Sequence, residues 1–538
     1  MRIKHALAAA VLAAALPGLA VAQLIPQGSE FQLNRYIDGS QFGPSIAVES
    51  AGDSVVVWSS AGQDGSGYGV FGRRFNSVGA FLGAEFQINN FTNSDQVLPS
   101  VAMDGSGSFV VAWTSIGQDR SGGGVFARRF GSTGTPKGRE FRVNTFTMNY
   151  QTNPSVAVDG SGNFVVVWSS DGQDGSFYGV FARRFDRAGA RLGGEFQVNT
   201  HTTYPQDHPV VAMDGSGNFV VAWQSLGQDG AGYGVFAQRF DSAGVPVGGE
   251  FQVNTHTSDQ QYDPSIAVGS SGNFVVAWTS RAQEAFDLGV FAQLFDSAGA
   301  PVGGEFQVNT YTTGDQHHPS VALLASGDFV VTWDCLGQDR INSIGIFAQR
   351  FDSVGGRVGG EFQVNTYTTN DQFGPSIAVD GSGKFVVAWT SDGQDYSGEG
   401  VFGQRYCANG DLDGDGICDS HDVIVTSPLG GDSVDCSNPS VAQPSLLWEA
   451  GTYDKFRVFI ASDPSFGPGT MVTSGDKLLT STSYTVSPKK WTSACEKAIS
   501  ANPSAPVLYM KILGVDADVS KSDPIRKTFS QVVEVSVQ

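Results

Sequence analysis

Beyond its first residues, the sequence has no apolar stretch long enough to cross a membrane. The chain starts with the basic residues Arg2 and Lys4, continues with a short apolar run over 6–16, and reaches Ala-Val-Ala at 20–22 before Gln23. This order is typical of a secretory signal peptide, and the run is too short to span a bilayer. No cysteine follows the cleavage site, which argues against a lipoprotein. We expect residues 1–22 to be removed and the mature protein to be secreted, without membrane insertion.

Basic residues are also scarce. The chain has 32 Lys and Arg against 53 Asp and Glu, and its formal net charge is −21. Nucleic acids and anionic membrane surfaces require a cationic footprint on their partners, so neither is expected here. The acidic balance suits an extracellular protein, including one that binds calcium.

Cysteine is rare, with five in 538 residues. An exported chain permits disulfides, but an odd number leaves at least one cysteine free or paired outside the chain. The chain is also too long for one ordinary core, so several domains or a repeat array are expected.

Three markers recur along most of the sequence. A Glu-Phe pair recurs at intervals of 55 residues, five times, and 56 residues, once, with its glutamate at Glu30, Glu85, Glu140, Glu195, Glu250, Glu305 and Glu361. A proline opens a strand-like segment at Pro44, Pro99, Pro154, Pro209, Pro264, Pro319 and Pro375. Seven of the nine tryptophans form the third series: Trp58, Trp113, Trp168, Trp223, Trp278, Trp333 and Trp389. Fixed periods of this length indicate a repeat architecture.

One repeat shows the expected plan of each unit. Alternating or continuous apolar residues predict strands over 155–158, 164–168, 180–185 and 196–199, and the Gly-rich segment 160–163 predicts a tight turn. Four antiparallel strands per unit match one blade of a β-propeller.

The ends of the array predict a closed ring. The array begins with a lone fourth strand at 31–34 and ends on a third strand at 401–406, so pairing these two removes exposed edges. The second strand is apolar on both faces and requires cover from both neighbouring blades. We therefore predict an all-β chain: a seven-bladed β-propeller over 30–406, closed by an N-terminal strand and followed by a β-sandwich.

The loops between strands two and three and between strands four and one are long and emerge on one face, as at 169–179 and 200–207. Because long loops on a rigid scaffold commonly carry binding residues, this face is the candidate for ligand contact. Gly-Gln-Asp recurs in these loops, with Gln283-Glu284 as a variant, and gives the candidate residues Gln63, Asp64, Gln118, Asp119, Gln173, Asp174, Gln228, Asp229, Gln338, Asp339, Gln394 and Asp395.

A glutamine also stands three residues before each marker proline, at Gln41, Gln96, Gln151, Gln206, Gln261, Gln316 and Gln372, where it is expected to ring the mouth of the channel. Together with Tyr68, Tyr178 or Tyr233, such side chains could hydrogen-bond to and stack on a sugar. The alternative is structural, because residues present in every blade often satisfy loop backbone groups or tie one blade to the next. At the end of an apolar strand, the marker tryptophans are expected in the core. The paired arginines Arg73-Arg74, Arg128-Arg129 and Arg183-Arg184 are expected on outer strands near acidic neighbours.

The segment 154–168, Pro-Ser-Val-Ala-Val-Asp-Gly-Ser-Gly-Asn-Phe-Val-Val-Val-Trp, resembles the repeat units of sialidase-like bacterial propellers. Its Asp-x-x-Gly turn is similar to their Asp-box, although the residue order of the box is not kept. The resemblance implies, for a glycosidase, an arginine cluster, a tyrosine nucleophile and acids in one central site. No such set can be assigned, because the candidates recur in blade after blade, and near-identical blades predict several equivalent weak sites. Only the divergent loops 281–288, with Glu284, and 335–344 are candidates for a unique catalytic set.

An Asp-rich segment follows the repeats. Its oxygen ligands have calcium-loop spacing, with a glycine at the sixth position and the carbonyl of Ile417 at the seventh. The β-branched, proline-terminated continuation at 423–428 argues against an EF-hand helix. The segment resembles a thrombospondin type 3 repeat, which implies Ca²⁺ ligands at Asp411, Asp413, Asp415, Asp419 and Asp422. The alternative is a solvated acidic linker. We predict a calcium-binding linker at 407–426, with Cys407 paired to Cys418 and His421 outside any metal site.

Residues 427–538 lack the repeat and predict a small β-sandwich similar to a fibronectin type III domain, with Trp448 in its core and Tyr509 in a late strand. Cys436 and Cys495 are candidates for a second disulfide, which leaves Cys335, expected on a propeller loop, unpaired.

The sequence favours a secreted, non-enzymatic binding or adhesion protein. Its propeller would present a multivalent face to a glycan or an extracellular protein, and Ca²⁺ would stabilise the junction. The alternatives are a propeller-type glycoside hydrolase or lyase, and a purely structural surface protein. Ligand identity and oligomeric state stay open.

Overall fold

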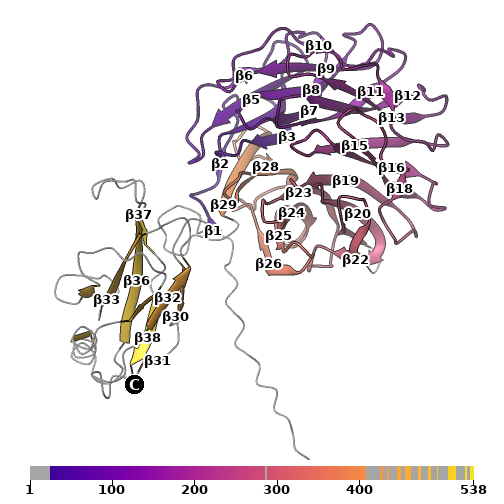
Figure 1. Cartoon of the computed structure of the whole chain (residues 1–538). Helices are drawn as coiled ribbons and strands as arrows, with labels where there is room; N and C mark the ends of the chain where they lie inside the picture. Colours follow the sequence, from indigo (N-terminus) through magenta and orange to yellow (C-terminus); the bar gives the residue numbers. More distant parts are fainter. Residues whose placement is uncertain are drawn as a thin grey trace, which may run out of the picture.

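Seven antiparallel sheets surround a common axis in the computed structural model of the chain (Figure 1). The structure describes residues 25–284 and 287–407, and beyond them the strands between 424 and 537 and residues 493–494. The strands of blades 1 to 3 are β3 (Gln41–Val48), β4 (Ser54–Ala61), β5 (Tyr68–Phe75), β6 (Phe86–Gln87), β7 (Gln96–Met103), β8 (Phe109–Ile116), β9 (Gly123–Phe130), β10 (Phe141–Arg142), β11 (Gln151–Val158), β12 (Phe164–Asp171), β13 (Tyr178–Phe185) and β14 (Phe196–Gln197).

The other blades repeat this order. Their strands are β15 (Gln206–Met213), β16 (Phe219–Leu226), β17 (Tyr233–Phe240), β18 (Phe251–Gln252), β19 (Gln261–Val268), β20 (Phe274–Glu284), β21 (Asp287–Phe295), β22 (Pro301–Gln307), β23 (Gln316–Leu323), β24 (Phe329–Leu336), β25 (Ile344–Phe351), β26 (Arg357–Gln363), β27 (Gln372–Val379), β28 (Lys384–Asp392) and β29 (Glu399–Cys407). The predicted seven-bladed propeller is confirmed.

The N-terminal segment closes the ring, as predicted. β2 (Phe31–Gln32) pairs antiparallel with β29, with Phe31 opposite Gly403, and β1 (Ile25–Pro26) pairs with the C-terminal end of β29. Blade 7 therefore contains strands from both ends of the repeat array, and its outer edge is covered by the start of the chain.

The strand bounds differ from the prediction in two ways. Each first strand begins three residues before its proline, because a bulge lets the strand continue past the residue that cannot donate to the ladder; in β11 the register shifts between Thr152 and Ser155. Each fourth strand in blades 1 to 4 is only two residues long. In blade 3, the side chain of Asn199 then accepts the amide hydrogen of Val180 at 2.8 Å and replaces the next ladder bond.

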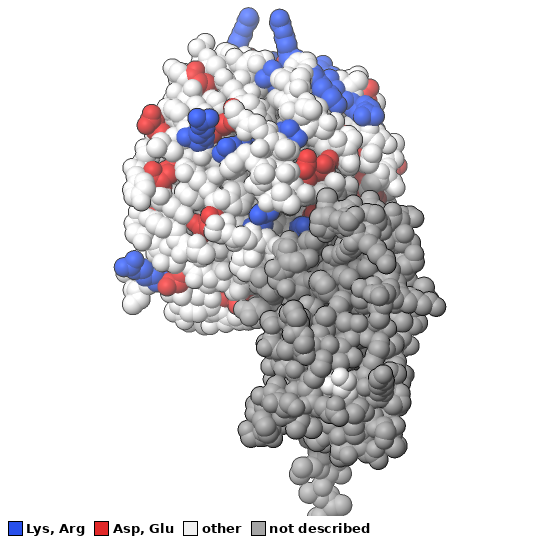
Figure 2. Space-filling view, turned by 90° about the vertical axis from the view of Figure 1, so that its left-hand side faces the viewer, with Lys and Arg blue, Asp and Glu red and all other residues white. Residues whose placement is uncertain are grey.

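The core lies between the blades. All seven marker tryptophans are fully buried, as predicted for core residues, and seven of the eight residues of β12 are buried. One apolar cluster joins Val165 and Val167 of blade 3 to Val221 and Trp223 of blade 4. On the side shown in Figure 2, Lys and Arg gather toward the upper edge, and Asp and Glu are scattered among uncharged residues.

Strands also form where the C-terminal domain was expected. β30 (Ile424–Ser427), β32 (Ser445–Glu449) and β35 (Ser483–Thr485) make one sheet. The other sheet contains β31 (Ser433–Val434), β33 (Lys455–Ala461), β34 (Met471–Thr473), β36 (Val507–Val515), β37 (Lys527–Phe529) and β38 (Val533–Val537). Their packing into a fibronectin type III-like sandwich stays a prediction.

Several predicted residues of the junction and C-terminal domain lie outside the described residues: Asp411, Asp413, Asp415, Ile417, Asp419, Asp422, Cys418, Cys436 and Cys495. Cys407 ends β29 and is buried; its pairing with Cys418 stays a prediction. Cys335 is free, but it is buried within β24 and not on a loop. Among the described residues, no helix has the length and apolar character needed to cross a membrane.

Candidate functional site

The repeated Gln-Asp pairs of the long loops are engaged inside the scaffold. In blade 2, Gln118 Nε2 donates to Glu140 Oε1 at 2.7 Å, and Glu140 also accepts the amide hydrogens of Asn90 and Phe91 from blade 1. The same glutamine–glutamate bond recurs in every blade: Gln63–Glu85, Gln173–Glu195, Gln228–Glu250, Gln283–Glu305, Gln338–Glu361 and Gln394–Glu30. The Glu-Phe marker is thus a tie between neighbouring blades, and Glu30 on the N-terminal segment supplies it for blade 7.

The partner aspartates shape their own loops. Asp119 Oδ1 accepts the amide hydrogen of Ser121 at 3.1 Å, and equivalent bonds hold the loops of Asp64, Asp174, Asp229 and Asp395. Burial raises the pKa of Asp339. These carboxylates have partners within the fold, which matches the structural alternative for the repeated residues.

The glutamines before the prolines do not ring the channel mouth, contrary to expectation, because all seven are fully buried. In blade 3, Gln151 Oε1 accepts a hydrogen bond from Asn144 Nδ2 at 3.0 Å, and Gln151 Nε2 donates to the carbonyl of Met148 at 2.7 Å. Sequence reasoning missed the asparagine, which also accepts the amide hydrogen of Val125. The asparagine–glutamine pair therefore joins strands three and four of blade 2 to strand one of blade 3.

The first arginines of the pairs lie near glutamates, as expected, and their hydrogen bonds go to backbone carbonyls. Arg128 donates to the carbonyl of Ile88 in blade 1 at 2.7 Å, and Arg183 donates to Val143 of blade 2 at 2.6 Å. Both bonds cross to the preceding blade, so the first arginine of each pair is another tie between blades.

Unlike these repeated polar residues, the residue directly before each marker proline varies from blade to blade. In all seven blades it has a positive φ, between 48° and 64°, and its identity changes from blade to blade: Gly43, Leu98, Asn153, His208, Asp263, His318 and Gly374. A positive φ is costly for the non-glycine residues and often marks a functional position. Since the first strands of neighbouring blades pack against one another around the axis, these residues ring the mouth of the channel on the long-loop face.

Three of these residues converge with a buried carboxylate across blades 4 to 6. His318 Nδ1 lies 2.9 Å from Asp334 Oδ2, and His318 Nε2 lies 3.9 Å from Asp263 Oδ2. Asp334 is 1 % exposed and stands where the other blades carry Ser, Thr or Gln. Its Oδ2 also accepts the amide hydrogen of Gly374 at 2.9 Å, while its Oδ1 has no hydrogen-bond partner. We call His208, Asp263, His318 and Asp334 the mouth cluster.

The electrostatics of the mouth cluster favour protonated imidazoles. The hydrogen bond and charge of Asp334, together with the charge of Asp263, outweigh burial and raise the pKa of His318 to about 9. Burial lowers the pKa of His208, but the hydrogen bond and charge of Asp207 and the charge of Asp263 produce a net increase. At neutral pH the cluster therefore presents an imidazolium between carboxylates.

Tyrosines lie beside the mouth cluster. Burial and the charge of Asp207 raise the pKa of Tyr233; for Tyr178, burial and Asp171 do so first, with Asp207 and Tyr150 adding to them. Burial raises the pKa of Tyr262 to about 12, with contributions from nearby carboxylates including Asp263. These phenols stay neutral and supply hydroxyl groups and ring faces next to the charged side chains. Of the three tyrosines proposed to stack on a sugar, Tyr178 and Tyr233 are thus near the cluster.

The arrangement can bind hydroxyl groups or move a proton. The carboxylates accept hydrogen bonds, the imidazolium donates them, and the His318–Asp334 pair has the form of a general acid oriented by a carboxylate. No group of three or more His, Cys, Asp or Glu side chains in the described part of the chain is arranged to hold a metal ion.

The mouth cluster was not predicted because its residues depart from the repeat. The signal was this departure: histidine or aspartate before the proline in three consecutive blades, and aspartate after Trp333. The divergent loops offered as catalytic candidates contribute differently: Gln283 keeps the tie to Glu305, and the Glu284 side chain lies outside the described residues.

No protein-family model matches the chain, and no curated protein matches it. Among solved structures, it is similar to a protein of unknown function from Dyadobacter fermentans, at 10 % identity and a TM-score of 0.44, covering 72 % of this chain and 99 % of that one. The β-propeller domain of the Trilobed protease from Pyrococcus furiosus follows at 10 % identity and a TM-score of 0.41, with 68 % and 93 % covered. An α-L-arabinanase from Penicillium chrysogenum, complexed with arabinobiose, has 12 % identity and a TM-score of 0.41, with 70 % and 98 % covered. These similarities are too low to assign an activity.

Proposed function

We propose that the chain is a secreted binding protein whose propeller takes a glycan at one site, the mouth cluster. One observation carries the proposal: the polar residues that recur in all blades bond to one another, whereas the residues that depart from the repeat converge at the channel mouth. This replaces seven equivalent weak sites with one asymmetric site on the same face.

A polyhydroxylated ligand fits the chemistry of this mouth. The Asp263 carboxylate can accept hydroxyl hydrogens, and His318 and His208 can donate hydrogen bonds to hydroxyl or ring oxygens. The buried Asp334 carboxylate orients His318 from behind. Charge-assisted hydrogen bonds of this kind are the stronger ones, and the tyrosines beside them offer ring faces. Asp207, Asp263 and Asp334 would repel an anionic ligand, so a neutral glycan is favoured over a strongly anionic one.

A glycan array tests the proposal, with variants that return the cluster to the residues of blade 3. His318→Asn copies Asn153, which holds the same positive φ, and Asp334→Ser copies Ser169, whose hydroxyl accepts the same kind of inter-blade amide bond. The double variant should fold and lose array binding. Leu98→Asn, the matched change in blade 2, should keep it. Equal binding by the double variant and the native protein would contradict the proposal.

A second candidate function is glycan cleavage, favoured specifically by the His318–Asp334 pair. A histidine that is protonated at neutral pH and held by a buried carboxylate can donate a proton to a leaving oxygen. Release of the chromophore from a panel of chromogenic glycosides, lost in His318→Asn, would support cleavage. Binding on the array without any turnover supports the binding function alone.

We also propose that Ca²⁺ stabilises the junction through Asp411, Asp413, Asp415, Asp419 and Asp422, and that the C-terminal domain serves as a spacer or adhesion module. Five closely spaced carboxylates repel one another without a cation. Calcium should therefore raise the melting temperature of the native protein but not that of the Asp413→Ala, Asp415→Ala double variant. No calcium effect on the native protein would contradict the site.

A further inference from the structure

On the face opposite the mouth cluster, formed by the short turns, an arginine joins three pairs of neighbouring blades. The position before the last aromatic residue of strand three is arginine in six blades: Arg74, Arg129, Arg184, Arg239, Arg350 and Arg405. Arg129 donates to the carbonyl of Arg187 in the next blade at 2.7 Å, and Arg239 donates to that of Ser297 at 2.8 Å. Arg184 makes the same kind of contact with Ala243. We call this contact the arginine latch.

Blade 5 lacks the latch because Leu294 takes the arginine position. Leu294 faces Gly355 of blade 6, as Arg239 faces Gly299 at the preceding junction, so the two side chains occupy equivalent places. The turn of blade 5 also starts with Gly269, where blades 2, 3, 4 and 7 have aspartate. Both charged groups of the repeat are thus absent at the junction of blades 5 and 6.

Gly269 and Leu294 line a larger cleft than those at three other junctions between blades. The cleft between blades 5 and 6 has a volume of about 440 Å³, compared with about 290 Å³ between blades 4 and 5. Between blades 2 and 3 the space is about 20 Å³. Both of these smaller clefts keep the charged pair, Asp214 with Arg239 and Asp104 with Arg129. The cleft of blades 5 and 6 has no charged lining residue, whereas each of the other three has both an acid and a base.

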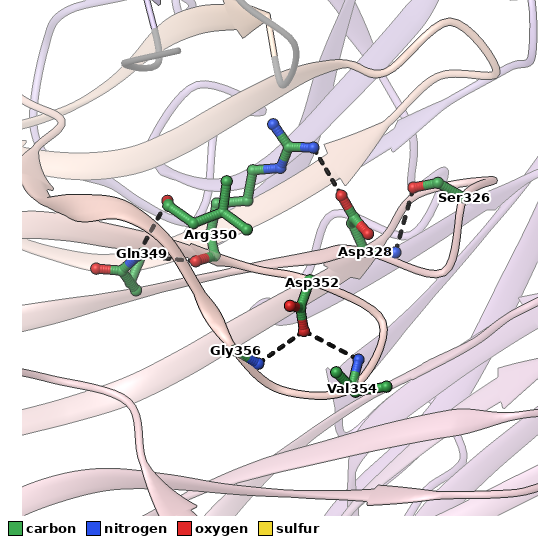
Figure 3. A network of polar contacts seen from close by, with 8 residues as sticks. Ser326, Asp328, Gln349, Arg350, Asp352, Val354 and Gly356 are labelled. Atoms are coloured by element: carbon green, nitrogen blue, oxygen red, sulfur yellow. Dashed lines mark hydrogen bonds and ion pairs between the residues drawn. The ribbon is translucent and has the colours of Figure 1, made fainter. Parts of the chain in front are cut away.

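The lining of this cleft is amphipathic. Leu294, Leu323 and Val302 contribute apolar surface, and Ser271, Ser326 and Ser353 contribute hydroxyl groups. Figure 3 shows the blade 6 side of this region, where Arg350 does not compete for the cleft because it pairs with Asp328 of its own blade at 2.6 Å. Asp352 is likewise occupied, accepting the amide hydrogens of Val354 and Gly356 at 3.0 and 2.7 Å.

We infer that the cleft between blades 5 and 6 is a second binding site, for a neutral ligand the size of one sugar ring. Such a ring has an apolar C–H face, which matches the leucines and valine, and a hydroxyl edge, which matches the serines. A charged sugar has no partner for its charge in this cleft and would lose its hydration on entry. The site lies on the opposite face from the mouth cluster and does not depend on the function proposed for it.

The repeat itself supplies the test. Leu294→Arg restores the residue of blade 4 and places a guanidinium where Ser353 can offer its carbonyl, as Ser297 does to Arg239. The probes are the methyl glycosides of fucose, galactose, glucose, mannose and N-acetylglucosamine, with galacturonic acid as the charged comparison. Ligand-observed NMR at millimolar probe concentration should show binding of at least one neutral glycoside to the native protein, and at least a tenfold loss of affinity in Leu294→Arg.

A second variant and a matched control keep the outcome clear. Leu294→Phe fills the cleft without adding charge and should also abolish binding, while Arg239→Leu, at the junction of blades 4 and 5, should leave the titration unchanged. Binding that persists in folded Leu294→Arg and Leu294→Phe proteins, equal binding of galacturonic acid, or no binding of any neutral probe would each overturn the inference. His318→Asn should not alter this binding, so failure here and failure at the mouth cluster are distinguishable.

Discussion

The junction of blades 2 and 3 and the junction of blades 5 and 6 are built from the same repeat but differ at both faces. Both keep the glutamate tie, through Glu195 and Glu361 respectively. At the first, Arg129 closes the short-turn face; at the second, Leu294 leaves a cleft. On the long-loop face, Asn153 at the first is replaced by His318 at the second. Residues shared by the two junctions hold the ring together, and residues that differ form the two proposed binding sites.

The largest expected effect is a loss of stability when a residue that recurs in every blade is changed. Asn144→Ala should lower the free energy of unfolding by about 3 kcal/mol or more, because it leaves Gln151 Oε1 and the amide hydrogen of Val125 buried without their partner. Chemical denaturation measures the loss, and array binding of the folded protein should not change. If Asn144→Ala lost binding without losing stability, Asn144 would be a binding residue and not a structural one, contrary to the prediction.

The second largest effect concerns how stability depends on pH. We expect a pH-dependent contribution from His318 at the junction of blades 5 and 6 and none from Asn153 at the junction of blades 2 and 3. The pKa of His318 in the folded protein, about 9, lies above its ordinary value of 6.5, so protonation stabilises the fold. This contribution is fully present below pH 6.5 and is lost as the pH rises through about 9. Melting temperatures of native and His318→Asn proteins should therefore differ at acidic pH and converge above pH 9. The charged groups that face the His318 imidazole, Asp334, Asp263 and His208, are present in both the native protein and the variant.

A constant difference in melting temperature across this range would show that His318 is not protonated in the fold. Asn153→Ala in blade 3 serves as the control. Its effect on stability should not vary with pH, because no titratable group of the mouth cluster is changed.

The smallest expected effect is that of the arginine latch. Arg239→Leu should cost about 1 kcal/mol, since it removes one hydrogen bond to the carbonyl of Ser297 at a partly exposed junction. Leu294→Arg should gain no more than this amount if the new guanidinium reaches Ser353. Differential scanning calorimetry of the two variants compares the junctions directly; a stability loss in Leu294→Arg would indicate that the cleft cannot accept the latch.

The fold was predictable because the sequence contains seven copies of the same repeat. The period, the tryptophans and the permuted ends specified the blades and the closure by Phe31–Gln32. The bulge before each proline was not predicted, since the positive φ at His208 accompanies a hydrogen bond from its amide to Ser169 of the preceding blade. Asp263 lies near His318 only because blades 5 and 6 are neighbours in the ring, whereas His318 and Asp334 lie on the paired strands β23 and β24 of blade 6.

The central claim is that the propeller has one glycan site at the channel mouth and not seven equivalent ones. Isothermal titration calorimetry of the glycan selected on the array, into the Leu294→Arg protein whose cleft is filled, tests it most directly. The account predicts one site per chain and no heat of binding when His318→Asn and Asp334→Ser are added. Several equivalent sites per chain, or an unchanged titration after these substitutions, would contradict it.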